Sequence, residues 1–184
     1  MLFVEYAHIL TAAYSSYVRQ HPIIIDADAS PSGFIAWYNH HSEMSKIRTV
    51  RPAPRNERFG VQRMEMLAIY FALRDNLVQI RRTLKRSSKK RFVIEVRSDS
   101  RSTVDQLRGA AEIRDSVMRR IVFVIGKLLA RIGCTTIVFD HLDRSRNIAG
   151  LMLEQRRRKE REKMMDLLGG RAFGSRYAPM PLCD

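Results

Sequence analysis

The sequence predicts an α/β fold, with a mixed five-stranded sheet flanked by helices and with helical extensions at both ends. Short runs rich in β-branched residues recur along the chain, and segments with helical apolar spacing lie between the later runs. Strand–helix–strand units favour parallel pairing. Three closely connected strand-like runs within residues 23–50 favour an antiparallel part. A mixed sheet satisfies both patterns.

Short turns join the three strands predicted at the start of this sheet. Ile23–Ile25 is a continuous β-branched run, which is typical of a strand that is covered on both faces. The Ser30–Gly33 cluster predicts a turn. We interpret Phe34–Tyr38 as the second strand and residues 46–50 as the third.

A long apolar helix is predicted next, over residues 62–80. It is dense in Met, Leu, Ile, Ala and Phe, so we expect it to be largely buried. Residues 81–91 contain seven basic residues in eleven and are interpreted as an exposed connector. Residues 92–97 alternate as a strand does. Ser98–Ser100 then predicts the N-cap of a helix that ends near Arg108.

The last predicted strand lies between two helices. Apolar residues at helical spacing indicate a helix over Asp115–Ile132, and residues 135–140 form the strand. A loop over residues 141–146 precedes the final helix, which begins near Asn147 and is strongly basic over residues 155–163.

The predicted domain organisation places the sheet between two extensions. We expect an N-terminal helical extension over residues 1–21, with an amphipathic helix at residues 3–19. The sheet domain would cover residues 22–155, followed by a basic C-terminal helix and tail over residues 156–184. We interpret the terminal helices as surfaces for packing, for homo-oligomer formation or for a protein partner.

The charge of the chain favours a polyanionic partner. The formal net charge is +14 and the isoelectric point is about 10.6, which makes nucleic acid the first candidate.

Cys134 and Cys183 are far apart and lack CxxC spacing, so we expect a reducing compartment with no disulfide framework and no zinc site. No apolar run reaches the length of a membrane span, and Glu5 argues against a secretory signal. We therefore expect a cytoplasmic protein that is not in a membrane.

Four short motifs carry a resemblance to a known family. They are Asp28-Ala29-Ser30 with Gly33, Arg63-Met64-Glu65 with Leu67-Ala68-Ile69, Ser98-Asp99-Ser100 with Val104 and Leu107, and the run His141–Ala149. In this order the motifs resemble the type 1 ribonuclease H (RNase HI-like) domain of the ribonuclease H-like superfamily. The resemblance covers about residues 23–155 and implies the ribonuclease H-like fold for the sheet domain.

The resemblance implies that Asp28, Glu65 and Asp99 are catalytic metal ligands. Clustered carboxylates repel one another unless cations hold them together, and hard oxygen ligands suit Mg²⁺ or Mn²⁺. In a two-ion site, one ion activates water and the other stabilises the leaving oxygen. The implied reaction is hydrolysis of the RNA strand of an RNA–DNA hybrid, with RNA recognised through its 2′-hydroxyl groups.

The fourth carboxylate departs from the family's pattern. The related segment usually has Ala-Asp at the start of the helix, whereas Ala149 is followed here by Gly150. Glu154 lies one turn later on the same helix face, so we predict it as the fourth catalytic metal ligand. Asp143 and His141, in the preceding loop, are alternatives. Without a replacement, the site would bind one ion well and the second poorly.

Other polar residues are predicted to support the site. Asp26 precedes Asp28 by two residues, on the same strand face, and is expected to join the polar cluster or to act as an alternative ligand. The residues that we predict to bind nucleic acid, from their places in the family motifs, are Ser30, Arg63, Ser100, Arg144 and Asn147.

The leading interpretation is a metal-dependent endoribonuclease that acts on RNA–DNA hybrids. One alternative is a catalytically weakened or inactive ribonuclease-H-like module that binds nucleic acid through its charge. Another is a related nuclease that acts on DNA or structured RNA, because phosphate contacts carry little information about the sugar. Residues 25–29 also look like the acidic strand of PIN-like nucleases, but that resemblance does not continue along the chain.

Overall fold

The computed structural model describes residues 23–52, 58–86, 93–132 and 136–172 of the chain. The predicted amphipathic helix at residues 3–19 and both cysteines lie outside these residues. Among the described residues, no helix combines the length and the apolar character that a membrane crossing requires.

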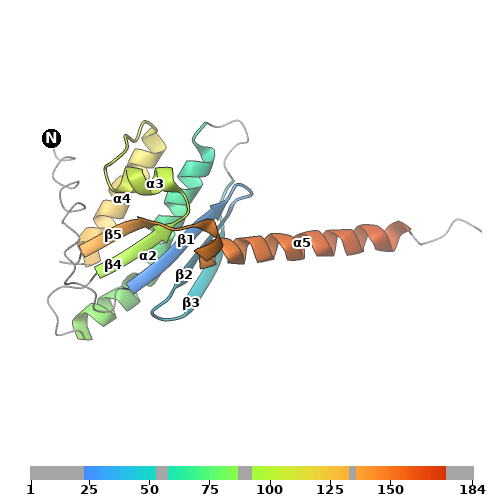
Figure 1. Cartoon of the computed structure of the whole chain (residues 1–184), viewed down its shortest axis with the longest axis horizontal. Helices are drawn as coiled ribbons and strands as arrows, with labels where there is room; N and C mark the ends of the chain where they lie inside the picture. Colours follow the sequence, from blue (N-terminus) through green and yellow to red (C-terminus); the bar gives the residue numbers. More distant parts are fainter. Residues whose placement is uncertain (1–22, 53–57, 87–92, 133–135, 173–184) are drawn as a thin grey trace, which may run out of the picture. The chain divides into compact units, whose positions relative to one another are not determined.

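A five-stranded sheet in the order β3-β2-β1-β4-β5 forms the centre of the fold (Figure 1). Strand β1 (Ile23–Ser30) pairs antiparallel with β2 (Phe34–Asn39), which pairs antiparallel with β3 (Met44–Thr49). On its other side, β1 pairs parallel with β4 (Val93–Ser98), and β4 pairs parallel with β5 (Thr136–His141). The predicted mixed five-stranded sheet is therefore confirmed.

Gly33 closes the turn between β1 and β2 in a backbone conformation that favours glycine. Its φ is +90°, and its amide donates to the Ser30 carbonyl at 3.0 Å. A Cβ at this position would lie 2.6 Å from the Val50 carbonyl oxygen. The Val50 amide in turn donates to the Gly33 carbonyl at 2.8 Å. The turn therefore also holds the chain just beyond β3.

Helices α2 (Gly60–Arg86) and α4 (Ser116–Ile132) cover one face of the sheet, behind the strands in Figure 1. Side chains alternate between the faces of a strand. The four odd-numbered residues of β1 over Ile23–Ala29 are buried in the same apolar cluster as residues of both helices. Exclusion of this apolar surface from water is the main force that holds the helical layer on the sheet.

Helix α5 (Ile148–Ala172) begins on the opposite face of the sheet. Its residues Ala149 and Leu153 form a second buried cluster with Ala36 of β2. Ala36 pairs with Asp28 across the antiparallel ladder, so the two side chains share a face. The even-numbered residues of β1 therefore face the side on which α5 starts.

Two short helices complete the described elements, and one predicted boundary is wrong. Helix α3 (Arg101–Leu107) follows β4, and the 3₁₀ helix η1 (Arg144–Arg146) precedes α5. Residues 81–86 were expected in a connector, but they are the last turns of α2. Arg, Lys and Leu are good helix formers, and Leu84 packs against the main apolar cluster. The helix therefore continues into the basic run.

The chain divides into two compact units, Met1–Leu153 and Glu154–Asp184. The first contains the sheet and both buried clusters. In the second, residues 154–172 are helical, with ion pairs one turn apart at Arg156–Glu160 (2.9 Å) and Arg158–Glu162 (3.8 Å). The domain boundaries after residues 21 and 155 remain predictions.

Candidate metal centre

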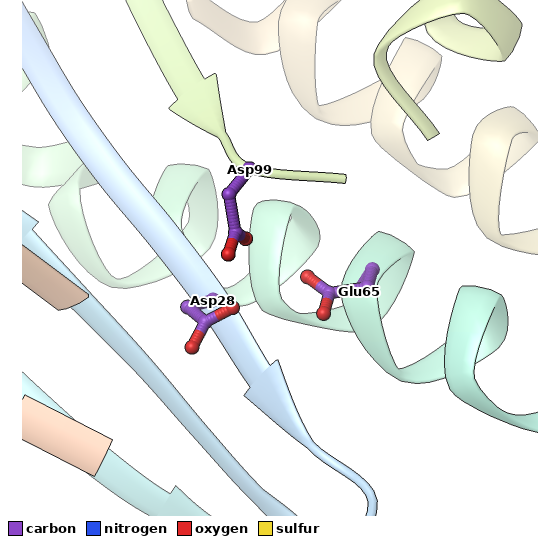
Figure 2. Close-up of side chains that lie close together, drawn as sticks. All are labelled: Asp28, Glu65 and Asp99. Carbon is purple, nitrogen blue, oxygen red and sulfur yellow. The ribbon is translucent and has the colours of Figure 1, made fainter. Parts of the chain in front are cut away.

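Three carboxylates from three separate elements converge at one edge of the sheet (Figure 2). Asp28 lies near the end of β1, Asp99 directly follows β4, and Glu65 lies in the second turn of α2. One carboxylate oxygen from each lies within 4.8 Å of the others. The parallel neighbours β1 and β4 bring their carboxyl ends to the same edge, which is why residues so far apart in sequence meet there.

Burial and mutual repulsion raise the pKa values of two of these carboxylates. Burial raises the pKa of Asp28 to about 7, and the charge of Asp99 and a hydrogen bond to it contribute further. Burial also raises the pKa of Glu65 well above its usual value, as do the charges of Asp28 and Asp99. The Ala29 amide and the Arg144 charge lower both pKa values, but less strongly. The group therefore favours protons or cations.

Glu65 carries the clearest sign of a missing partner. Its side chain is only 6% exposed, and its Oε2 atom is buried with no hydrogen-bond partner in the described structure. A buried polar atom without a partner is costly. A divalent cation held by oxygen ligands would satisfy this atom and would relieve the repulsion among the three carboxylates.

Gly150 lies against the carboxylates, where the family's pattern has Asp. A Cβ at this position would be 3.2 Å from Asp28 Oδ2 and 3.6 Å from Asn147 Cγ. The predicted replacement, Glu154, is exposed and belongs to the second compact unit. Within the described part of the chain, the group of close carboxylates contains only Asp28, Glu65 and Asp99. The role of Glu154 as a ligand stays a prediction.

Asp26 lies outside that group and has its own partners. It is completely buried, and Arg97 Nε donates to its Oδ1 at 2.8 Å. His40 Nε2 lies 2.8 Å from Oδ2, and the Ile148 amide donates to the same oxygen at 3.3 Å. Asp26 therefore joins β1, β4 and the turn after β2 to the start of α5, so its side chain supports the site from within the fold.

Asn147 is completely buried between the carboxylates and β1. Its Nδ2 donates to the Ala27 carbonyl at 3.2 Å and reaches Asp99 Oδ1 at 3.5 Å. Its Oδ1 accepts from the Gly150 amide at 3.4 Å. These contacts hold Asp99 and the first turn of α5 in place. Asn147 has no exposed surface that nucleic acid could contact in this structure.

Three residues predicted to bind nucleic acid also form bonds within the fold. Ser30 Oγ lies 2.6 Å from Ser32 Oγ, and Ser100 Oγ lies 2.8 Å from Thr103 Oγ1. Arg63 donates through Nε and Nη2 to Asp115, at 2.9 and 2.6 Å. This pair of hydrogen bonds ties the first turn of α2 to the start of α4.

The loop before α5 contains the remaining predicted residues. Arg144 is exposed, and its charge lowers the pKa values of Asp28 and Glu65, so it acts at the carboxylates. His141 is half-buried at the end of β5, where it pairs with Ser98. Asp143 is exposed. Neither His141 nor Asp143 belongs to the group of close carboxylates among the described residues.

Sequence reasoning missed two supporting interactions. Asp115 was predicted only as the start of a helix, yet it also accepts from the Met118 amide at 2.8 Å and caps α4. An Asp just before an apolar periodic segment is a usual capping signal, so the sequence could have predicted that Asp115 caps the helix. The pairing of Arg97 and His40 with Asp26 could not be predicted, because no local pattern joins residues of β1, β4 and the turn after β2.

The arrangement of the sheet and helices is that of the ribonuclease H-like fold. No protein-family model and no curated protein matches the sequence. Among solved structures, RNase H1 from the halophilic archaeon Halobacterium salinarum matches with a TM-score of 0.54 at 19% identity, over 70% of this chain and 91% of that one. LC11-RNase H1, isolated from compost, matches with a TM-score of 0.54 at 18% identity, over 73% of this chain and 93% of that one. These similarities confirm the predicted fold class.

Proposed function

We propose that this chain is a divalent-metal-dependent phosphodiester hydrolase that cleaves the RNA strand of RNA–DNA hybrids. The convergence of Asp28, Glu65 and Asp99 on a ribonuclease H-like fold carries the proposal. The substrate comes from the family resemblance of the motifs and from the RNase H1 proteins that share the fold.

The residues of the site fit Mg²⁺ or Mn²⁺. All three side chains offer hard oxygen ligands, Glu65 Oε2 has no hydrogen-bond partner among the described residues, and repulsion within the group favours a cation. We propose that Asp28, Glu65 and Asp99 hold the metal. When bound, the ions would lower the pKa of a coordinated water and would neutralise charge on the phosphate.

The chain's own residues prepare the site for a phosphodiester. Asn147 holds Asp99 in position, and Asp26 holds the start of α5, which contains Gly150. The exposed guanidinium of Arg144 acts on the carboxylates electrostatically, so it is well placed to attract the substrate phosphate. The high net charge of +14 adds affinity that does not depend on the nucleotide sequence.

A second candidate function is favoured by Gly150. Because position 150, beside Asp28 Oδ2, is glycine, the group of described residues contains three carboxylates, which would hold one ion well and a second ion poorly. The alternative is therefore a weakened or inactive module that binds nucleic acid without cutting it.

Cleavage of a labelled RNA–DNA hybrid, with and without Mg²⁺ or Mn²⁺, tests the proposal. Duplex DNA, duplex RNA and single strands serve as comparison substrates. We expect metal-dependent cutting of the RNA strand of the hybrid. Asp99→Asn should slow cutting by more than the ~10–100-fold typical of losing an outer-shell partner, and should spare most hybrid binding.

Asp105→Asn is the matched control, because Asp105 lies on α3 close to Asp99 in sequence but outside the carboxylate group. It should cut at the normal rate. Tight, salt-sensitive binding with no cutting in either metal would favour the binding module. Cutting of duplex DNA or duplex RNA in preference to the hybrid would instead indicate a related nuclease.

A further inference from the structure

The outer side of the helical layer carries many cations and no exposed carboxylate. Helix α4 contains no Asp or Glu, and in α2 Glu65 is buried while Asp75 pairs with Arg48 at 2.6 Å. The exposed cations of these two helices define the α2–α4 surface: Arg74, Arg81, Arg82, Lys85, Arg119, Arg120, Lys127 and Arg131. Helices α2 and α4 pack against each other on the same face of the sheet (Figure 1), so all eight exposed cations belong to one helical layer.

None of these eight cations forms an ion pair with a carboxylate of the described residues. Their other contacts leave the charge in place: Lys127 lies 4.4 Å from the centre of the Phe123 ring, and Arg119 donates to the Arg114 carbonyl. Elsewhere, arginines such as Arg63 and Arg97 are neutralised by Asp115 and Asp26. The α2–α4 surface is therefore a concentrated positive charge that the carboxylates of the described residues do not neutralise.

The part of this surface that α2 contributes is separate from the carboxylate site. Glu65 lies in the second turn of α2, and the cations of the same helix run from Arg74 to Lys85. At 1.5 Å per residue, they lie roughly 14 to 30 Å further along the helix axis. A ligand on this surface would therefore not need to occupy the carboxylate site.

We infer that the α2–α4 surface is a second nucleic-acid-binding site, which recognises the phosphate backbone. A row of unneutralised cations along two adjacent helices complements a continuous polyanion. Six of the eight are arginines, whose planar guanidinium forms paired hydrogen bonds with phosphate oxygens. Phe123, which is 53% exposed beside Lys127, offers an aromatic face for contact with a base or sugar.

Binding here would differ from recognition at the carboxylates. Phosphate contacts do not distinguish RNA from DNA, and they require no divalent metal. The site would bind a DNA duplex that the proposed hydrolase does not cut, with affinity that falls steeply as salt rises. A long nucleic acid bound to this surface would remain near the carboxylate site after it had dissociated from that site.

The test measures the affinity of the full chain for a labelled DNA duplex of about 30 base pairs, in EDTA, over a series of salt concentrations. The test variant combines Arg81→Gln, Arg82→Gln, Lys127→Gln and Arg131→Gln. The control variant removes the same charge from the exposed side of α5 through Arg158→Gln, Lys159→Gln, Arg161→Gln and Lys163→Gln. Gln is a good helix former at such exposed positions, so both variants should fold, which circular dichroism checks.

We expect the test variant to lose about tenfold or more in affinity at moderate salt, and its plot of log affinity against log salt to be shallower by about 0.9 for each lost phosphate contact. The control variant should keep most of the wild-type affinity and most of the wild-type salt slope. A charge-preserving variant, Arg81→Lys with Arg82→Lys and Arg131→Lys, should retain the wild-type salt slope.

Three outcomes would overturn the inference. Equal losses in the test and control variants would indicate a non-specific effect of net charge. A loss confined to the control would assign binding to α5. Failure to bind the duplex, combined with binding of phosphatidylserine vesicles through the same four residues, would assign the surface to an anionic membrane. Because the assay contains no metal and no hybrid, its result is independent of whether the carboxylates catalyse hydrolysis.

Discussion

At the scale of single residues, Asp28 shows how burial conflicts with charge at the site. Its pKa is raised to about 7, first by burial and then by Asp99, so near neutral pH the metal-free protein holds a carboxyl group that is still partly protonated. Such strain is common where a site is organised for a ligand, because the ligand removes the cost. The pH dependence of stability and the affinity for metal ions distinguish a metal-ligand site from an acidic cluster without a ligand.

The first prediction concerns the pH dependence of stability. The unfolded chain loses the Asp28 proton near its ordinary pKa of 3.8, and the folded chain loses it near 7, so the folded state binds the extra proton between these values. Stability of the metal-free protein should therefore fall as pH rises through this range. Thermal unfolding in EDTA should show a larger drop in midpoint from about pH 5 to about pH 8 for the wild type than for Asp28→Asn.

Added Mg²⁺ should reverse that drop. A metal ligand must be deprotonated, so stabilisation by the ion should be greater at about pH 8 than at about pH 5. Parallel curves for wild type and Asp28→Asn, with no effect of Mg²⁺ on either, would contradict the assignment of Asp28 as a ligand.

The second prediction restores the carboxylate that Gly150 lacks. In Gly150→Asp, the new Cβ would lie 3.2 Å from Asp28 Oδ2, so the metal-free variant should be less stable than the wild type near neutral pH. With a fourth oxygen ligand, its affinity for Mn²⁺ should rise about tenfold, which titration calorimetry measures.

Gly150→Asn is the matched control, because it adds nearly the same volume without the charge. It should reproduce any steric cost but should not gain affinity for Mn²⁺. If the Asp and Asn variants bind the ion equally, position 150 does not contribute to the metal centre.

At the scale of elements, the site depends on how α4 and α5 begin. Asp115 caps α4 and pairs with Arg63 of α2, while Asp26 pairs with Arg97 and accepts from the Ile148 amide of α5. Each interaction satisfies a helix amide and a charged side chain at the start of a helix. The helix starts are thus fixed by carboxylates that do not belong to the metal centre.

The third prediction is that Asp115→Ala destabilises the protein by about 2–3 kcal/mol, since it removes both a helix cap and a charged hydrogen bond. Asp115→Asn can still accept from the helix amide and should cost less. Urea unfolding near neutral pH measures both losses.

The pH dependence of this effect has the opposite sign to that of Asp28. Arg63, through a hydrogen bond, lowers the pKa of Asp115 to about 2 from 3.8. The stabilisation is therefore present above about pH 4 and is lost as pH falls toward 2. If the wild type and Asp115→Asn differ equally at neutral and strongly acidic pH, the ion pair is not the source of the difference.

The fourth prediction compares a buried ion pair with an exposed one. Asp26→Asn should cost about 3 kcal/mol or more, because it leaves Arg97, which is 16% exposed, without its charge partner. Asp140→Asn removes the partner of Arg108, but that pair is about 40% exposed, so the loss should be below about 1 kcal/mol. Similar losses in urea unfolding would contradict a supporting role for Asp26.

At the scale of the whole molecule, the apolar core ends where α5 has just begun. Of the side chains that the structure describes, Leu153 is the last member of either buried cluster. The described large apolar residues beyond it, Met164, Met165 and Leu167, are all exposed. The sheet and its two helical layers thus have a core of their own.

The fifth prediction follows from this distribution. A chain that ends after Gln155 should retain cooperative unfolding, with a urea midpoint close to that of the full chain, because stability follows buried apolar surface. The result also tests the predicted boundary between residues 155 and 156. A broad or non-cooperative transition would show that the C-terminal residues complete the core.

The sequence by itself determined the order of the elements and the three motifs that contain Asp28, Glu65 and Asp99. These signals are local: a β-branched run, apolar helical spacing and polar residues where strands end. The end of α2 was predicted wrongly, because a run of basic residues suits both an exposed connector and the exposed side of a helix.

The motif selected Asp28 over Asp26 as the ligand, but only the tertiary structure decided the different surroundings of the two carboxylates. Both carboxylates lie on the same face of β1, and the alternation of side chains cannot tell them apart. Asp26 lies beside Arg97 and His40 and is neutralised, whereas Asp28 lies beside Glu65 and Asp99 and is not. The difference comes from neighbours on other strands and helices, because electrostatic energy depends on distance in space and not on separation along the chain.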